Sequence, residues 1–207
     1  IDADTLKPIA DEVSAKGDVM LIGFAGGGTR NIFANKPVRN LAEMKGLKVR
    51  VQGAPIWSKT FSAIGMSPTV IAYDEVYNGI QNGVISAGEN EAAGVEAMKF
   101  YEVGPNINLT QHAITIRPIA FSGKTFKKLP PDLQAAILKA GKEAGTFGRQ
   151  IESSEDQKKL DTLQAAGKLK LVPFTDKAAM KKLADPVMAE YAKEIGATEI
   201  YNKINSM

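Results

Sequence analysis

The feature of this sequence that most constrains its fold is a polar helical pattern of about 35 residues, roughly three times the average helix length. It begins in Leu129-Pro130-Pro131, where proline favours the first helical turn, and runs from Asp132 to Ala166. Three glycines, at positions 141, 145 and 148, weaken its middle. A single compact lobe has no use for such a helix, whereas a helix that crosses two lobes does. The sequence therefore predicts a two-lobed molecule with a long lobe-spanning helix.

Short apolar or alternating runs separate the helical patterns and predict the α/β class with a largely parallel sheet. The expected strands and extended segments are 18–25, 31–35, 47–51, 69–72, 86–89, 108–114, 115–122 and 168–173. The other expected helices are 1–14, 40–45, 55–64, 73–82, 92–99 and 176–195, the last interrupted near Pro186. Gly26-Gly27-Gly28 is expected to break the chain between the first two strands, because consecutive glycines permit positive φ.

The composition is that of an ordinary globular protein, with 44% hydrophobic and 24% charged residues. There is no cysteine, which excludes disulfides, thiolate catalysis and cysteine-ligated zinc, and which suits an oxidising compartment. The chain has one histidine and contains neither a G-x-S-x-G nor an H-E-x-x-H motif, and the phosphate-loop pattern is missing. We therefore expect a protein that is not an enzyme and that holds no metal and no cofactor.

The charge and the ends of the sequence bear on partners and location. The net charge of +3 is spread along the chain, so it gives no case for nucleic acid and fits an anionic ligand only loosely. No apolar run approaches the roughly 20 residues that span a bilayer. The chain starts at Ile1 and not at Met, which we interpret as a processed or truncated start with any export signal upstream.

Three separated stretches place charged or amide side chains where strands or turns end. They are Gly26–Phe33 (GGGTRNIF), Met44–Gln52 (MKGLKVRVQ) and Ile71–Glu91, and they supply Arg30, Arg50 and Asn90. Two guanidiniums and an amide, with no nucleophile or metal cluster beside them, suggest a site that binds a carboxylate and does not catalyse a reaction on it. A guanidinium presents two parallel donors that lysine cannot reproduce. The alternative for Arg50 is a surface arginine on a strand, and the alternative for Arg30 is a loop arginine that faces solvent.

These stretches resemble the solute-binding proteins of the tripartite ATP-independent periplasmic (TRAP) transporters, of the C4-dicarboxylate-binding type. The resemblance covers nearly the whole chain in the same order. It is carried by GGGTRNIF, KGLKVRV, GMSPTVIAYDEVY, the Glu89-Asn90-Glu91 turn, KFYEV, Leu109-Thr110 with His112, and LPPDLQ. In one departure, the proline that the family places after the asparagine is Glu91 here, which makes the pocket wall more acidic.

The resemblance implies a periplasmic-binding-protein fold of two lobes, and it implies that the first lobe is incomplete. The chain lacks roughly the first hundred residues of the family chain, a segment of ordinary domain size. We expect residues 1–27 and 116–150 to be the remainder of lobe 1, and residues 28–115 and 151–207 to form lobe 2.

The resemblance also implies the roles of several site residues. Arg50 would pair bidentately with a ligand carboxylate, Arg30 and Tyr73 would line the pocket, and Glu89 and His112 would join Arg30 in a closure network. On the residues alone, His112 is equally well explained as a core histidine.

Four further residues complete the expected site. Asn90 donates from its amide or acts as a helix N-cap, or both. Gln52 and Glu91 add acceptors, and Arg117 would bind a second polar group of the ligand, with a purely structural role as its alternative. Because a dicarboxylate would be repelled by Glu91, we favour a hydroxylated or sugar acid as the ligand.

The function implied is that of a periplasmic receptor, which is expected to be a monomer. It would close two lobes over a small organic acid and deliver it to TRAP permease subunits in the membrane. Three alternatives stay open at this point. They are a ligand-sensing regulatory domain on the same fold, a C4-dicarboxylate as the ligand, and an α/β enzyme that acts on acyl anions, for which no nucleophile or base can be named.

Overall fold

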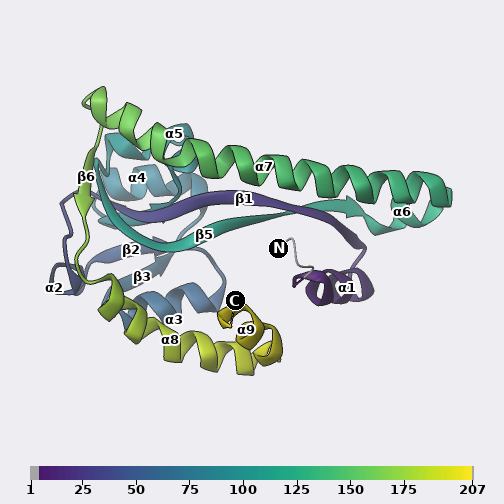
Figure 1. The fold of residues 1–207 in the computed structure, drawn as a ribbon. Coiled ribbons are helices and arrows are strands. Elements are labelled where there is room, and N and C mark those ends of the chain that lie inside the picture. The colour runs from purple at the N-terminus through teal and green to yellow at the C-terminus, as the bar shows by residue number, and fades with distance from the viewer. Residues whose placement is uncertain (1–4, 207) are drawn as a thin grey trace. The chain divides into compact units, whose positions relative to one another are not determined.

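A computed structural model describes residues 5–206 (Figure 1). The strands are β1 (Val19–Ala34), β2 (Lys48–Val51), β3 (Ser67–Val70), β4 (Ala87–Asn90), β5 (Asn106–Ser122) and β6 (Lys170–Pro173). The α-helices are α1 (Lys7–Lys16), α2 (Leu41–Met44), α3 (Pro55–Ala63), α4 (Val76–Gln81), α5 (Ala92–Ala97), α6 (Gly123–Lys128), α7 (Pro131–Ala165), α8 (Lys177–Glu194) and α9 (Thr198–Asn205). Short 3-10 turns, η1 (Tyr73–Glu75) and η2 (Phe100–Glu102), precede α4 and follow α5. Residues 1–4 of the helix expected at 1–14 lie outside the described residues.

The six strands form one sheet in the order β3-β2-β4-β1-β5-β6. β2 runs parallel to both β3 and β4, and β5 runs parallel to β6. β1 is antiparallel to β4, with Asn31 opposite Asn90. The prediction of the α/β class is therefore confirmed, and the expected largely parallel sheet is corrected to a mixed one. The difference arises because β1 lies in the middle of the sheet, between β4 and β5, and runs antiparallel to β4.

The predicted break at the triple glycine is wrong, because β1 continues through it as one strand. Gly26 and Gly27 have φ of 106° and 118°, and a Cβ at Gly26 would lie 2.1 Å from the carbonyl oxygen of Thr115. The glycines thus let β1 keep its course against β5, where any side chain would collide. The two extended segments expected at 108–114 and 115–122 are likewise one strand, β5.

The helix that dominates the sequence is present as α7, Pro131–Ala165. Its glycines serve close packing and do not interrupt it: a Cβ at Gly141 would lie 2.4 Å from the carbonyl oxygen of Ile22 on β1. Pro186 also fails to interrupt α8, which is continuous from Lys177 to Glu194. α9 follows a turn at Gly196 and was not predicted.

The chain divides into two compact units. Unit 1 comprises Ile1–Gly27, Thr115–Glu155 and Asn202–Met207, and unit 2 comprises Gly28–Ile114 and Asp156–Tyr201. β1, β5 and α7 each contribute residues to both units. The bounds of the units differ from those of the predicted lobes at three places. Thr115, residues 151–155 and the residues from Asn202 onward belong to unit 1. The sequence does not mark these bounds, because no local feature of a continuous strand or helix shows where its long-range contacts change.

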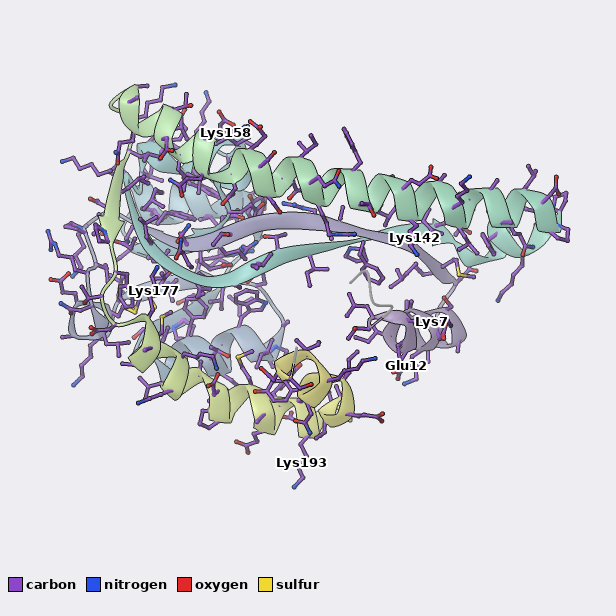
Figure 2. All side chains as sticks on the ribbon, in the orientation of Figure 1. Lys7, Glu12, Lys142, Lys158, Lys177 and Lys193 are labelled. Atoms are coloured by element: carbon purple, nitrogen blue, oxygen red, sulfur yellow. The ribbon has the colours of Figure 1, made fainter. Side chains whose placement is uncertain are left out.

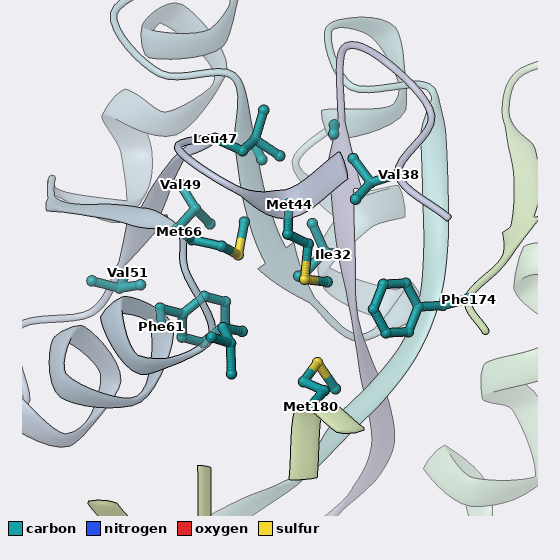
Figure 3. Close-up of a cluster of buried hydrophobic side chains, with 13 residues drawn as sticks. Ile32, Val38, Met44, Leu47, Val49, Val51, Phe61, Met66, Phe174 and Met180 are labelled. Atoms are coloured by element: carbon teal, nitrogen blue, oxygen red, sulfur yellow. The ribbon is translucent and has the colours of Figure 1, made fainter. Parts of the chain in front are cut away.

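Unit 2 holds most of the buried core, in two layers on opposite faces of the sheet. Ile32 and Phe33 are neighbours on β1 and alternate between the layers, as the two-residue period of a strand requires. One layer packs β1 and β2 against α3 and α8, with Phe61 and Met180 in contact with it (Figure 3). The other packs the sheet against α4, α5 and the end of α7 through Ile80, Val95 and Leu160, among others. Helices on both faces hold the sheet edge rigid, and the candidate site lies at that edge.

Charged side chains cover the outer surfaces, as with Lys193 of α8, which projects from its helix (Figure 2). None of the helices within residues 5–206 has the length and apolar character that crossing a membrane demands.

Candidate carboxylate-binding site

Most of the predicted site residues meet at one edge of the sheet in unit 2. β2, β3 and β4 are parallel, so their carboxyl ends lie at the same edge, where ligands of open α/β sheets usually bind. β2 brings Arg50 there, with Gln52 directly after its last residue, and β4 ends in Glu89 and Asn90. Arg30 reaches this edge on β1, since its neighbour Asn31 pairs with Asn90.

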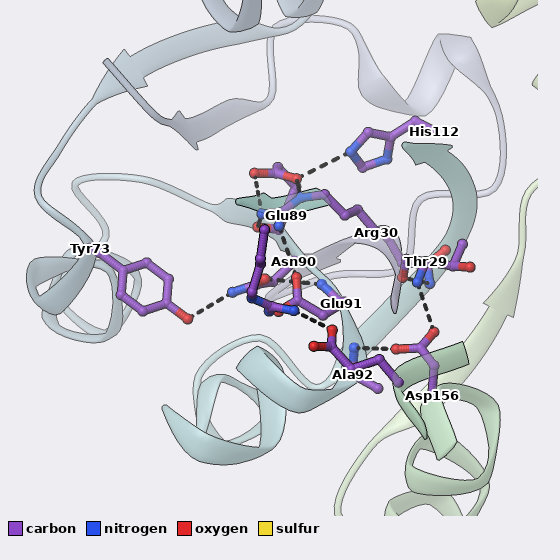
Figure 4. Close-up of polar contacts among 12 residues, drawn as sticks. Thr29, Arg30, Tyr73, Glu89, Asn90, Glu91, Ala92, His112 and Asp156 are labelled. Carbon is purple, nitrogen blue, oxygen red and sulfur yellow. Dashed lines mark hydrogen bonds and ion pairs between the residues drawn. The ribbon is translucent and has the colours of Figure 1, made fainter. Parts of the chain in front are cut away.

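Arg30 is held by two carboxylates (Figure 4). Its Nε donates to Glu89 Oε2 at 2.6 Å and its Nη2 donates to Glu89 Oε1 at 2.8 Å, a bidentate pair. Nη2 also donates to the Glu89 carbonyl at 3.1 Å, and Nη1 donates to Glu91 Oε2 at 2.8 Å. The side chains of Glu89 and Glu91 are 0% and 5% exposed. Trp57 lies beside this group, with the Arg30 Cζ 5.7 Å from its ring centroid.

His112 extends the same network, as the resemblance implied. Its Nε2 lies 3.3 Å from Glu89 Oε2, and its Nδ1 lies 2.9 Å from the hydroxyl of Thr110. Thr110 Oγ1 in turn accepts from the backbone N–H of Ile32. With the proton on Nε2, the imidazole donates to Glu89 and accepts from Thr110, so every group is satisfied. His112 is thus tied to the ion pair and is not an isolated core histidine.

The environment shifts the pKa values of the paired groups in opposite directions. Burial acts to raise the pKa of Glu89, but hydrogen bonds from His112 and Arg30 outweigh it, so the pKa lies below its ordinary value. Burial acts to lower the pKa of Arg30, but the hydrogen bond and charge of Glu89, with the charge of Glu91, raise it overall. These shifts favour the charged forms of both Glu89 and Arg30.

Arg50 has a different environment. Its side chain is buried, with the residue 6% exposed, and its Nε donates to the carbonyl of Ile71 at 2.9 Å. Its Cζ lies 5.5 Å from the ring centroid of Tyr73. Within residues 5–206 no carboxylate pairs with it. Burial lowers the pKa of Arg50, although the charges of Glu89 and Tyr73 act to raise it.

Tyr73 and Asn90 link the two arginines. Asn90 Nδ2 donates to the Tyr73 hydroxyl at 2.8 Å, and Asn90 Oδ1 accepts from the backbone N–H of Glu91 at 3.0 Å. Gln52 lies two residues beyond Arg50, and its Oε1 is buried and accepts no hydrogen bond within residues 5–206. A buried acceptor without a donor costs free energy unless something supplies one.

Sequence reasoning missed Asp156, whose carboxylate organises this edge from α7. Oδ2 accepts from the backbone N–H of Thr29 at 3.1 Å, and Oδ1 accepts from the N–H of Ala92 at 3.0 Å. Each partner is the chain neighbour of one member of the Arg30–Glu91 pair (Figure 4). Asp156 also satisfies the first N–H of α5, a role expected of Asn90. Nothing in the polar run around Asp156 distinguishes it from a surface residue.

Arg117 lies in unit 1, where its Nη1 pairs with Glu152 of α7. It is not part of the cluster in unit 2, and its predicted contact with a ligand stays a prediction. Unit 1 also contains a cavity of about 200 Å³ between residues of α1, β1 and α7, which holds none of the predicted site residues.

Comparison with known proteins identifies the family. Residues 2–194 match the model of the family "Bacterial extracellular solute-binding protein, family 7". A solute-binding protein of Sulfitobacter sp. (strain NAS-14.1) is 48% identical over 206 residues, which is 100% of this chain and 62% of the relative.

Two solved structures are similar to the chain. A TRAP periplasmic solute-binding protein from Sulfitobacter sp. NAS-14.1 with bound α-D-taluronate has a TM-score of 0.94 and 49% identity, over 97% of this chain and 65% of that one. Another from Chromohalobacter salexigens DSM 3043, with bound D-glucuronate, has a TM-score of 0.91 and 25% identity, over 99% of this chain and 68% of that one.

A mixed α/β fold with a buried arginine at the carboxyl edge of its sheet fits a receptor for small anions. The chain belongs to family 7 of the bacterial extracellular solute-binding proteins, a family of periplasmic receptors and not of enzymes. It spans 62% of the length of its Sulfitobacter relative and therefore covers only part of the full fold.

Proposed function

We propose that the protein is the periplasmic receptor of a TRAP transporter and that it binds a small hydroxylated acid, of the sugar-acid class, at the unit 2 edge. The observation that carries this proposal is Arg50, a buried guanidinium with no carboxylate partner within residues 5–206. A buried charge is costly unless it is paired, so the site is built to receive a carboxylate. The fork of Arg50 matches that group with two parallel hydrogen bonds.

Gln52 supports a hydroxylated ligand. Its buried Oε1 accepts no hydrogen bond within the described residues, and an amide oxygen needs a donor. A carboxylate has no hydrogen to donate at neutral pH, whereas a sugar hydroxyl does. Gln52 follows the end of β2 and lies two residues beyond Arg50 in the chain, so we propose that one ligand contacts both. The bound taluronate and glucuronate in the two similar structures carry both groups, which supports the sugar-acid class.

The remaining cluster residues have roles consistent with binding and not with catalysis. Tyr73 and Asn90 line the site beside Arg50, and Glu89 with His112 fixes Arg30. We propose that the receptor acts as a monomer, that ligand favours its closed state, and that it delivers the acid to permease subunits.

Isothermal titration calorimetry with the protein at its full natural length tests this function. We expect taluronate, galacturonate or glucuronate to bind, and Arg50→Ala to weaken binding by at least 100-fold, about 2.7 kcal/mol. Arg50→Lys keeps the charge and loses the fork, so it should rescue little of that loss.

Arg39→Ala is the matched control, since Arg39 is exposed and its side chain pairs with Glu43, four residues along the chain. An affinity of Arg50→Ala within threefold of the wild type would refute the role of Arg50. Tight binding of succinate without binding of any sugar acid would replace the proposed ligand class with C4-dicarboxylates.

A further inference from the structure

The positive charge of Arg30 is already matched within the cluster. Its Nε and Nη2 bind the carboxylate of Glu89, and its Nη1 binds that of Glu91 at 2.8 Å. Both carboxylates are almost completely buried. Two negative charges therefore face one guanidinium, and Arg30 has no net positive charge to offer to a ligand.

Arg50 has no such partner within residues 5–206, so of the two arginines at this edge it is the one whose guanidinium is not paired with a carboxylate there. One ligand carboxylate matches it. A second ligand carboxylate would find no unmatched buried cation there, because the other guanidinium is held by Glu89 and Glu91.

Glu91 is connected to the Arg50 position by a short series of contacts. Arg50 lies over Tyr73, the Tyr73 hydroxyl accepts from Asn90, and Asn90 accepts from the backbone N–H of Glu91. Burial is the largest cause of the raised pKa of Tyr73, and the negative charge of Glu91 also raises it. The Glu91 carboxylate therefore interacts electrostatically with the Tyr73 hydroxyl. Two constraints fix Glu91: its ion pair with Arg30, and the bond from the N–H of Ala92 to Asp156.

We propose that Glu91 makes this site selective for acids with a single carboxylate, by holding a fixed negative charge next to the part of the ligand beyond Arg50. The inference rests on the proposed function, since it concerns the same site, and it names the charge class of the ligand. A second carboxylate would meet the like charges of Glu91 and Glu89 in a buried setting, which selects against it. A hydroxyl at the same place would meet an acceptor.

The test uses two linear six-carbon acids, galactonate and galactarate, which differ only in whether the far terminal carbon is a CH₂OH or a carboxylate. Calorimetry on the protein at its full natural length should show galactonate binding at least 30-fold more tightly than galactarate. Glu91→Gln keeps the shape of the side chain and removes its charge, so it should narrow that ratio at least tenfold. The control is Glu96→Gln on α5, the helix that follows Glu91, where Glu96 forms an exposed pair with Lys159. It should leave the ratio unchanged.

Wild-type protein that binds galactarate as tightly as galactonate would overturn the inference without any variant having to fold. A ratio that changes less than threefold in Glu91→Gln, while galactonate still binds, would also overturn it and would leave the proposed function intact. Failure of the wild type to bind any hydroxylated or dicarboxylic acid would instead remove both.

Discussion

At the scale of single residues, the two buried arginines of the site differ in partners and not in type. Arg30 is ionised and fully paired, and its pKa is raised by Glu89 and Glu91, although burial opposes this. Arg50 is equally enclosed but has no carboxylate within residues 5–206, so burial prevails and its pKa is lowered. Arg30 therefore stabilises the folded protein, while Arg50 keeps its electrostatic attraction for a ligand.

Replacing Arg30 with methionine should destabilise the protein strongly. Arg30→Met leaves Glu89 and Glu91 buried without their counter-charge, and removing one partner of a buried ion pair costs about 3–5 kcal/mol. Urea unfolding at neutral pH measures this loss. Arg39→Met is the matched control, because Arg39 and Glu43 form an exposed pair worth about 1 kcal/mol or less. Equal losses in the two variants would contradict the role given to Arg30.

The location of the polar side chains at strand ends could be predicted from the sequence. The alternation of apolar and polar residues and the turn that follows each strand indicate where these side chains lie. Arg50 and Asn90 lie at the carboxyl edge for this reason. That Arg30 joins Glu89 and Glu91 could be inferred only in part, because pairing between β1 and β4 joins residues far apart in the chain. Asp156 could not be found, since its partners are backbone N–H groups that have no sequence signature.

At the scale of elements, most helices and the short strands were predictable, α6 and α9 were missed, and the long strands were not recognised as single strands. Periodicity locates α3, β2 and α7 because each presents an apolar face or ends at a glycine or proline. Glycine has two opposite uses, ending an element or allowing close approach, and the local pattern is the same for both. Gly26 and Gly141 take the second use, which only the packed neighbours reveal.

Asp156 joins three elements, so its removal should loosen the edge on which they meet. Asp156→Ala leaves the N–H groups of Thr29 and Ala92 without their acceptor, and we expect a loss of about 1–3 kcal/mol in unfolding free energy. Hydrogen exchange should also speed up at these two amides. Asp161→Ala is the control on the same helix, since Asp161 is exposed and accepts only from Gln157. If both variants are equally stable, Asp156 has no organising role.

At the scale of the whole molecule, the sequence predicted two lobes and a long helix shared between them. In the structure α7 has residues in both units, and so do the strands β1 and β5. The site cluster, from Arg30 on β1 to His112 on β5, lies entirely within unit 2. Its ion pairs therefore bear on the stability of that unit. The division of α7 at residue 155 could not be predicted, because it depends on long-range contacts and not on the helix itself.

This contribution makes stability depend on pH in a defined direction. The folded-state pKa of Glu89 is lowered, so the unfolded chain binds its proton more readily than the native protein does. The stabilisation is thus present above the unfolded pKa of about 4.3 and is lost as pH falls through the lower folded value. Urea unfolding between pH 7 and pH 3 measures this effect. At pH 7, Glu89→Gln should have a lower free energy of unfolding than the wild type. This gap in unfolding free energy should narrow in the acid range, because only the wild type loses the charge of the Glu89 carboxylate there. Glu96→Gln, which removes an exposed carboxylate of unit 2, should run parallel to the wild type throughout. A gap for Glu89→Gln that stays constant down to pH 3 would mean that Glu89 titrates alike in both states, and that the bonds from Arg30 and His112 do not hold its charge.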